Sequence, residues 1–269
     1  MRVALKALRL ISHLLTGVLL CAAVALDPST WLRTGFGKRL VPEKLARWWS
    51  QRLLHILNIH VTVHGTGVSG AHVIVANHIS WLDIPVICSL EATRFVAKSE
   101  VRRWPVAGWF AVAAGTFFIR RGKGGSKPLL AAALPHLKAG GSFTFFPEGT
   151  TTAGASVVKF HPRLFSAAID AQCRVQPLAL RYEPSPSGAA VAPFIGDDDL
   201  VSHILRVLRE ESLTVEMTYL PSIDATGRER DEIAAETQAA IREVVTSAVE
   251  STFTDVDEAI DATLTPAFY

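Results

Sequence analysis

The sequence predicts an α/β protein in which helices flank a mostly parallel or mixed central sheet. Short apolar or alternating runs, which are typical of strands, recur along the chain and are separated by longer runs with helical periodicity. Polar residues with catalytic potential follow directly after several of the predicted strands. With 269 residues, of which 49% are hydrophobic, the chain is long enough to bury the core that such a sheet needs.

Composition and charge exclude several other classes. A net charge of +2 is too small to indicate nucleic-acid binding. The mean hydropathy of +0.27 is high for a soluble enzyme and predicts membrane contact. Cys21, Cys88 and Cys173 are odd in number and widely spaced, without the pairing of a zinc site or a disulfide framework. We therefore expect no metal and a reducing, cytoplasm-facing compartment.

Residues 7–26 form an apolar stretch about as long as the hydrocarbon core of a bilayer requires, so a membrane helix is favoured. A secretory signal peptide is one alternative, because Arg2, Lys6 and Arg9 precede the apolar run and Ala23-Val24-Ala25 resembles a cleavage site. The excess of basic residues follows the stretch, which places that side in the cytoplasm. Because both flanks are basic, a helix that lies in the interface is a further alternative.

A second helix begins at Pro42, since proline suits the first helical position. Along residues 44–57 apolar side chains recur at spacings of three and four, which predicts an amphipathic helix. Trp48 and Trp49 suit either the lipid headgroup region or packing on the protein. We expect a two-helix membrane-binding appendage over residues 1–57, a main α/β domain over residues 58–250 and a C-terminal tail over residues 251–269 with no assigned role.

From residue 59 onwards, predicted strands alternate with predicted helices. The strands cover residues 59–64, 72–75, 94–98, 115–119, 142–146, 175–182 and 213–220. The helices cover residues 81–90, 101–114, 127–139, 163–171, 197–210 and 232–250. This alternation is the main support for the predicted fold class.

Three features of these elements give more specific expectations. Ser80 is expected to cap the helix that follows it. Pro177 cannot donate a ladder hydrogen bond, so its strand is expected to bend there or to lie at a sheet edge. His60 and His64 share one face of the first strand. An exposed edge strand is favoured over a metal site, because no third ligand accompanies them.

His78 and Asp83 lie five residues apart, directly after the buried strand at residues 72–75. The end of such a strand is where α/β proteins place their chemistry. A carboxylate on one imidazole nitrogen would fix the tautomer and stabilise the imidazolium that forms when the other nitrogen takes a proton. The pair predicts a general base, and a purely structural pair is the alternative. Asn77 or nearby backbone N–H groups are candidates to stabilise an oxyanion.

A basic loop follows the predicted strand at residues 115–119. Arg120 and Arg121 enter a glycine-containing segment that also carries Lys123 and Lys127. Cations beside flexible backbone N–H groups make a suitable cradle for a phosphate. A solvated charge run is the alternative interpretation.

Four stretches together resemble a known family. The His-four residues-Asp block at residues 78–83 is followed by residues 115–121, by the Phe-Pro-Glu-Gly-Thr block within residues 145–151, and by residues 175–179. In this order and spacing they resemble the motif blocks of the glycerolipid acyltransferase family, which includes bacterial enzymes that acylate 1-acylglycerol 3-phosphate. The resemblance covers about residues 45–220.

This resemblance implies a reaction and its catalytic residues. An acyl group would pass from a thioester, acyl-carrier protein or acyl-CoA, to the hydroxyl of 1-acylglycerol 3-phosphate and give phosphatidic acid. His78 would act as general base and Asp83 would orient it. No metal or other cofactor is implied beyond the acyl thioester as co-substrate. The expected location is the inner membrane, with the catalytic domain facing the cytoplasm.

The resemblance also implies substrate-binding residues. Arg121 matches the motif arginine and would bind the acceptor phosphate, with Arg120 as a second candidate and Lys98 sharing the task. Glu148, with its neighbours Gly149 and Thr150, would belong to the acceptor site. From the residues alone, a carboxylate in this turn has two roles open to it, bonding a hydroxyl or supporting the loop. The block at residues 175–179 would shape the acyl site, and Thr152-Ala153-Gly154 departs from the family pattern.

Three other functions compete with this one. Within the family, the acceptor would be lyso-ornithine lipid or another lysophospholipid. In another enzyme class, Ser80 would act with His78 in a lipid hydrolase, although a Gly-x-Ser-x-Gly elbow is missing. The third is a non-catalytic lipid-binding membrane protein.

Overall fold

The structure is a computed structural model that describes residues 2–26, 42–120, 122 and 125–264. The helices are α1 (Arg2–Leu26), α3 (Pro42–Leu57), α4 (Asp83–Leu90), α5 (Ala107–Ala113), α6 (Lys127–Lys138), α7 (Ser166–Ala171), α8 (Leu200–Arg209) and α9 (Arg230–Leu264). Short 3₁₀ helices cover Ser99–Arg103 and Pro162–Phe165. The strands are β1 (Ile59–His64), β2 (His72–Ala76), β3 (Arg94–Lys98), β4 (Phe117–Ile119), β5 (Ser142–Phe145), β6 (Arg174–Tyr182), β7 (Leu213–Tyr219) and β8 (Ile223–Asp224).

All of these strands join one mixed sheet in the order β1-β7-β6-β2-β5-β3-β4, with β8 paired to β6. The run β6-β2-β5-β3-β4 is parallel throughout. Strands β7 and β8 are antiparallel to β6, and β1 is parallel to β7. The predicted α/β class with a mixed central sheet is therefore confirmed.

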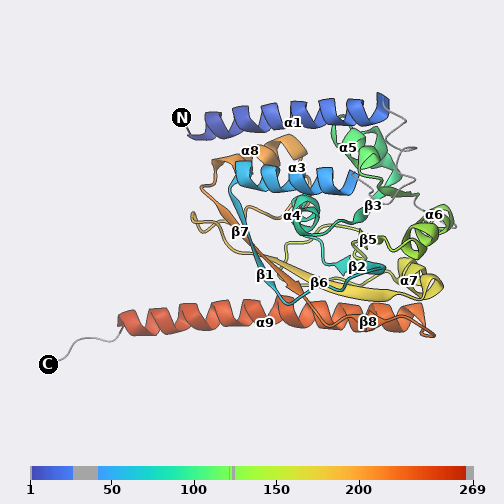
Figure 1. Ribbon diagram of the computed structural model, residues 1–269. Helices are drawn as coiled ribbons and strands as arrows, with labels where there is room; N and C mark the ends of the chain where they lie inside the picture. The colour runs from blue at the N-terminus through green and yellow to red at the C-terminus, as the bar shows by residue number, and fades with distance from the viewer. Residues whose placement is uncertain (1, 27–41, 121, 123–124, 265–269) are drawn as a thin grey trace.

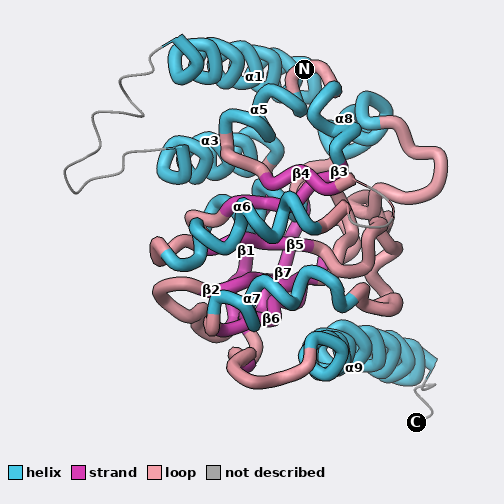
Figure 2. The backbone as a smooth tube through the Cα atoms, turned by 90° about the vertical axis from the view of Figure 1, so that its right-hand side faces the viewer, coloured by secondary structure: helices cyan, strands magenta, loops and turns pink. Residues whose placement is uncertain are grey.

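The alternation of side chains along β2 explains how the sheet is covered on both faces. Val73 and Val75 belong to one buried cluster, and Ile74 and Ala76 belong to the other, because successive side chains of a strand point to opposite faces. Helices α3, α4 and α8 supply the cluster on the Ile74 side. Helices α6, α7 and α9 supply the cluster on the Val73 side. Figures 1 and 2 show α1 and α9 on opposite sides of the molecule.

The N-terminal helices pack on the rest of the protein. Buried residues of α1 fall on one stripe that includes Lys6, Leu10 and His13. Leu10 and the α3 residue Leu53 belong to the same buried cluster as the β2 residue Ile74. The two predicted helices are present, and they share a core with the sheet. The division of the chain at residue 57 stays a prediction.

Two helix boundaries differ from the sequence-based expectation. The expected helix over residues 101–114 is split into a 3₁₀ helix and α5, and Val106 between them has a φ of +62°. Pro105 separates the two pieces, because proline disfavours the α conformation in the residue before it. Helix α9 continues to Leu264, where no structure was predicted after residue 250. No glycine or proline occurs between Arg230 and Leu264, so nothing local ends the helix once it has formed.

One of the two positions expected for Pro177, a sheet edge, is wrong, and so is the expected cap by Ser80. Pro177 lies in the interior strand β6 and not at a sheet edge. It is tolerated because β6 pairs with β8 through Arg174 and Val175 and with β7 from Leu178 onwards, so that side of the ladder is interrupted at Pro177. Ser80 does not cap α4, which begins at Asp83 without a side-chain cap hydrogen bond.

Candidate active site

His78 and Asp83 form a hydrogen-bonded pair at the end of β2. The imidazole Nδ1 lies 2.8 Å from Asp83 Oδ2. The His78 side chain is 19% exposed and that of Asp83 is fully buried. Because Nδ1 faces the carboxylate, the proton on Nδ1 is held there and Nε2 is left to accept a proton. Among the described residues, none forms a hydrogen bond with Nε2.

Asp83 also organises the loop that carries His78. Its Oδ2 accepts hydrogen bonds from the backbone N–H groups of Ile79, at 2.7 Å, and Ser80, at 3.0 Å. Its Oδ1 accepts a hydrogen bond from the Tyr182 hydroxyl at 2.9 Å. The oxygens of this buried carboxylate thus have the hydrogen-bond donors that a buried polar group requires. Asp83 therefore fixes both the imidazole and the backbone that presents it.

Phe146 covers one face of the His78 ring. The two ring centroids lie 3.9 Å apart and the planes are inclined by 10°. Phe146 directly follows β5, which is the neighbour of β2 in the sheet. The stacked ring prevents the imidazole from rotating away from Asp83, and it shields that side of the base from water.

Glu148 supports the same loop from β5. Its side chain is buried, with Oε1 accepting from the His78 N–H at 2.7 Å and Oε2 accepting from the Val158 N–H at 3.0 Å. Burial raises the pKa of this carboxyl, and the two backbone donors act against that rise. Both oxygens are thus engaged in supporting the loop, the second of the two roles left open by the sequence. A contact between Glu148 and an acceptor stays a prediction.

The turn around Glu148 has the geometry that its sequence predicted. The Gly149 N–H donates to the carbonyl of Phe146 at 3.2 Å, which closes a tight turn. Gly149 has a φ of +69°, a backbone conformation that favours glycine. Gly149 and Thr150 are both exposed. Their proposed part in the acceptor site stays a prediction.

The residues that depart from the family pattern also contact the His78 loop. The backbone N–H of Thr152 donates to the carbonyl of His78 at 2.8 Å. At Gly154, with a φ of +84°, a β-carbon would lie 3.0 Å from Ile79 Cδ1. The His78 peptide is therefore bonded through its N–H to Glu148 and through its carbonyl to Thr152.

The predicted cationic residues lie at the carboxyl ends of neighbouring strands in the sheet. Because β2, β5, β3 and β4 are parallel, their carboxyl ends meet at one edge. Lys98 is the half-buried last residue of β3, and Arg120 is exposed directly after β4. Arg121 lies outside the described residues. Adjacent strands are about 4.8 Å apart, so β4 lies about 14 Å from β2, and a phosphate-binding cation there must reach back across two strands.

Two other sequence candidates have different surroundings from those expected. The buried Asn77 amide is paired with β6, donating to the Leu180 carbonyl at 2.9 Å and accepting from the Leu180 N–H at 2.8 Å. One of its two amide N–H groups is thus engaged with the sheet, and a contact with an oxyanion stays a prediction. The Ser80 hydroxyl is fully buried and has no hydrogen-bond partner among the described residues. It makes no contact with His78 of the kind that a serine nucleophile requires.

Tyr182 and Phe146 were missed by reasoning from the sequence. Phe146 stands next to the Pro147-Glu148 turn, so its position beside the site was available, but its ring stacking was not. Tyr182 lies 99 positions after Asp83, and only the pairing of β6 beside β2 brings them together. The sequence carries no local signal for that contact.

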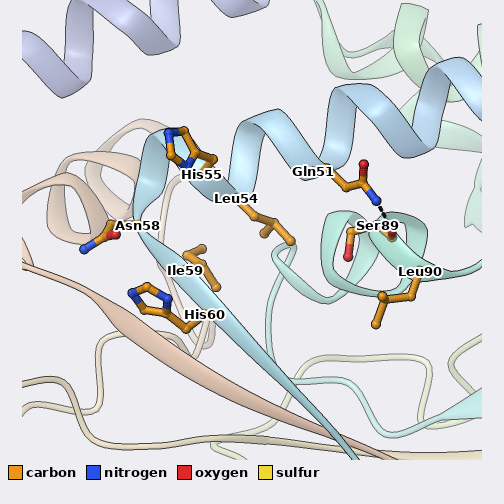
Figure 3. Close-up of a pocket in the computed structure, with 8 residues that line it drawn as sticks. All are labelled: Gln51, Leu54, His55, Asn58, Ile59, His60, Ser89 and Leu90. Atoms are coloured by element: carbon orange, nitrogen blue, oxygen red, sulfur yellow. Dashed lines mark hydrogen bonds between the residues drawn. The ribbon is translucent and has the colours of Figure 1, made fainter.

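A separate cavity of about 260 Å³ lies between the last turns of α3, the start of β1 and the end of α4 (Figure 3). Gln51 crosses one side of it and donates to the Ser89 carbonyl at 2.8 Å. None of the predicted site residues lines this cavity. The described part of the chain contains no group of three or more His, Cys, Asp or Glu side chains that could hold a metal ion.

Comparison with known proteins agrees with the motif blocks. Residues 60–181 match the family described as Acyltransferase. The chain is 41% identical to the lyso-ornithine lipid O-acyltransferase of Pseudomonas aeruginosa, over 90% of this chain and 93% of that protein. It is 34% identical to the 1-acyl-sn-glycerol-3-phosphate acyltransferase of Neisseria gonorrhoeae, over 62% of this chain and 64% of that protein.

A solved structure shows the same fold. The crystal structure of the 1-acyl-sn-glycerophosphate acyltransferase from Thermotoga maritima aligns with a TM-score of 0.58 and 22% identity, over 92% of this chain and 97% of that one. At this identity the likeness concerns the fold alone. The family match and the near full-length similarity to the Pseudomonas enzyme lead to one conclusion: the chain belongs to the glycerolipid acyltransferase family.

Proposed function

We propose that this protein transfers a fatty acyl group from an acyl thioester to the hydroxyl of a lysolipid, with His78 as general base. The observation that carries the proposal is the His78–Asp83 pair, held at 2.8 Å in the loop where the family's catalytic block falls. Nε2 of His78 takes the hydroxyl proton as the lipid oxygen attacks the thioester carbonyl. The C–O bond forms, the C–S bond breaks, and the imidazolium returns the proton to the departing thiolate. Either acyl-CoA or acyl-carrier protein satisfies this chemistry.

Lyso-ornithine lipid is the acceptor we favour. Relatives named lyso-ornithine lipid O-acyltransferase resemble the chain over most of its length. The Pseudomonas enzyme is 41% identical over 90% of this chain, and that of Rhodobacter capsulatus is 34% identical over 70% of it. The 1-acyl-sn-glycerol-3-phosphate acyltransferases of Neisseria match over 62% of this chain. 1-Acylglycerol 3-phosphate is the second candidate, because the predicted cations at the ends of β3 and β4 suit its phosphate group.

The test is an assay of purified protein with both lysolipids against one labelled acyl thioester, supplied first on CoA and then on carrier protein. We expect the diacyl product from lyso-ornithine lipid at the higher kcat/KM. A reversed ranking would make 1-acylglycerol 3-phosphate the acceptor. Release of free fatty acid without acyl transfer would contradict the proposal and support the hydrolase, which Ser80→Ala should then inactivate.

Replacing Arg121 by alanine should raise the KM for 1-acylglycerol 3-phosphate about tenfold or more and change kcat little. A charge-assisted hydrogen bond to a phosphate is worth about 1.5–3 kcal/mol, and a uniform loss of acceptor binding affects KM alone. Arg120→Ala should have a smaller effect. Arg174→Ala serves as a control, because Arg174 is exposed at the start of β6, away from the edge that carries His78. An unchanged KM would remove Arg121 from the acceptor site.

We also propose that the protein lies on the cytoplasmic face of the inner membrane through α1. Its stretch Arg2–Ala22 is long and apolar enough to cross a bilayer by length and composition. However, its inner face is bonded to the protein: Lys6 Nζ donates to the Glu210 carbonyl at 2.8 Å, and His13 Nε2 lies 3.0 Å from the Trp49 carbonyl. A helix held along its length favours docking in the interface over a span.

The outward face of α1 is apolar. Leu8, Ile11, Leu15 and Leu19 are 56–70% exposed and recur at spacings of three and four, so they form one stripe. An apolar stripe on a helix that is fixed to a folded domain is typical of proteins that insert into one leaflet. Insertion of this stripe would hold the candidate active site close to lipid substrates.

Replacing both Leu15 and Leu19 by glutamate should weaken binding to phosphatidylethanolamine–phosphatidylglycerol vesicles at least about a hundredfold, because each buried leucine contributes about 1.5–3 kcal/mol. Vesicle co-sedimentation measures the effect. Val63→Glu, on the exposed edge strand β1, should bind like the wild type. Equal binding by both variants would show that α1 is not the docking surface.

A further inference from the structure

Within the described part of the chain, Tyr182 is the one side-chain partner of Asp83 Oδ1, the carboxylate oxygen that does not contact His78. Its hydroxyl donates to Asp83 Oδ1 at 2.9 Å, while Oδ2 receives His78 and two backbone N–H groups. Tyr182 is the last residue of β6, the strand that pairs with β2 on the side opposite β5. The carboxylate is thus bonded from two sides of the sheet.

We propose that the Tyr182 hydroxyl is a positioning residue, which holds Asp83 in the orientation that serves His78. This inference rests on the proposed acyl transfer. Without the hydroxyl, Oδ1 would be a buried carboxylate oxygen with no donor, a costly arrangement. The carboxylate would then be freer to rotate about its Cβ–Cγ bond, so the imidazole that it carries would be held less often in the orientation that the reaction needs.

The same hydrogen bond sets how strongly Asp83 attracts the proton of the imidazolium. A donor on Oδ1 draws negative charge away from Oδ2, so it limits the basicity that Asp83 gives to His78. Burial, and then the charge of Asp83, keep the pKa of Tyr182 well above its usual value, so the hydroxyl stays protonated near neutral pH and donates to Asp83. The second carboxylate that interacts with His78 is that of Glu148, which accepts a hydrogen bond from the His78 backbone N–H.

Tyr182→Phe tests the role, because it removes the hydroxyl and keeps the ring. We expect kcat to fall about ten- to thirtyfold, the loss typical of one hydrogen bond to a charged group, with KM for both substrates within about twofold of wild type. We also expect the acidic limb of the kcat/KM profile to move to higher pH by about half a unit to one unit, because Asp83 then stabilises the imidazolium more strongly.

Tyr219→Phe is the matched control. Tyr219, on β7, also donates its hydroxyl to a carboxylate, that of Glu91, and among the described residues it forms no hydrogen bond with His78 or Asp83. It therefore reports the effect of losing a tyrosine–carboxylate hydrogen bond on stability alone. We expect its acidic limb to coincide with that of the wild type.

A second measurement does not depend on turnover. The imidazole Cε1–H resonance of His78, identified by its absence in His78→Gln, is titrated by NMR in the wild type and in both tyrosine variants. An upward shift of the His78 midpoint in Tyr182→Phe alone supports the inference, even if none of the tested lysolipids is acylated. Coincident midpoints and coincident acidic limbs in the three proteins would overturn it and leave Tyr182 with a structural role only.

Discussion

Replacing His78 by alanine should lower kcat for acyl transfer at least about a thousandfold, while the Kd for the lysolipid changes less than about threefold. A positioned general base contributes roughly 10²–10⁴ in rate, and an alanine side chain carries no group that could take the proton. The ring is only 19% exposed, so its removal also admits water beside Phe146. Single-turnover kinetics with a labelled thioester measure the loss.

His64→Ala is the control for this variant, because His64 is exposed at the end of β1. It should retain wild-type turnover. If His78→Ala kept more than about a tenth of the wild-type kcat, His78 would not be the base. If binding of the lysolipid were lost in parallel, the histidine would belong to the acceptor site instead.

Asp83→Asn should lower kcat about a hundred- to thousandfold and destabilise the fold by about 1–3 kcal/mol. Asparagine has one carbonyl oxygen, and this oxygen must replace an Oδ2 that accepts from His78, Ile79 and Ser80. The amide nitrogen then faces Tyr182, whose hydroxyl is able to turn and accept. The loop is therefore kept, but no negative charge remains to stabilise the imidazolium.

The measurements are kcat for the variant and its free energy of unfolding in urea. Asp83→Ala is a poorer test, because it leaves buried N–H donors of the loop without an acceptor and confounds catalysis with folding. Asp198→Asn is the control, since Asp198 pairs with Arg206 on α8 outside the site. Wild-type kcat in Asp83→Asn would show that the carboxylate charge plays no part in the reaction.

The order of strands gives the candidate site a clear arrangement. The base follows β2, the supporting carboxylate Glu148 follows β5, and the predicted cations follow β3 and β4 along the same edge. An acceptor held by the cations would therefore extend along this edge toward His78. Such positioning converts an encounter in the membrane into an oriented reaction.

Much of the fold was predictable because its signals are local. The wholly buried strand β2 follows from an unbroken apolar run, and α3 follows from apolar residues at spacings of three and four. The His78–Asp83 contact was predictable for the same reason, since five residues and one turn separate the two side chains. Expectations that depended on tertiary contacts were less successful. Pro177 proved to lie in an interior strand, and Ser80 proved to cap nothing.

By itself, the sequence determined the α/β class, the run of strands and helices, the family and the histidine–carboxylate pair, all of which depend on periodicity, on short motifs in a fixed order or on residues close together in the chain. Only the tertiary structure decided that Glu148 bonds the His78 backbone, that Asn77 bonds Leu180, and that Tyr182 bonds Asp83. These contacts join residues 70–103 positions apart. They exist because β5 and β6 lie on either side of β2, and a hydrophobic pattern that buries every strand equally well does not specify which strands become neighbours.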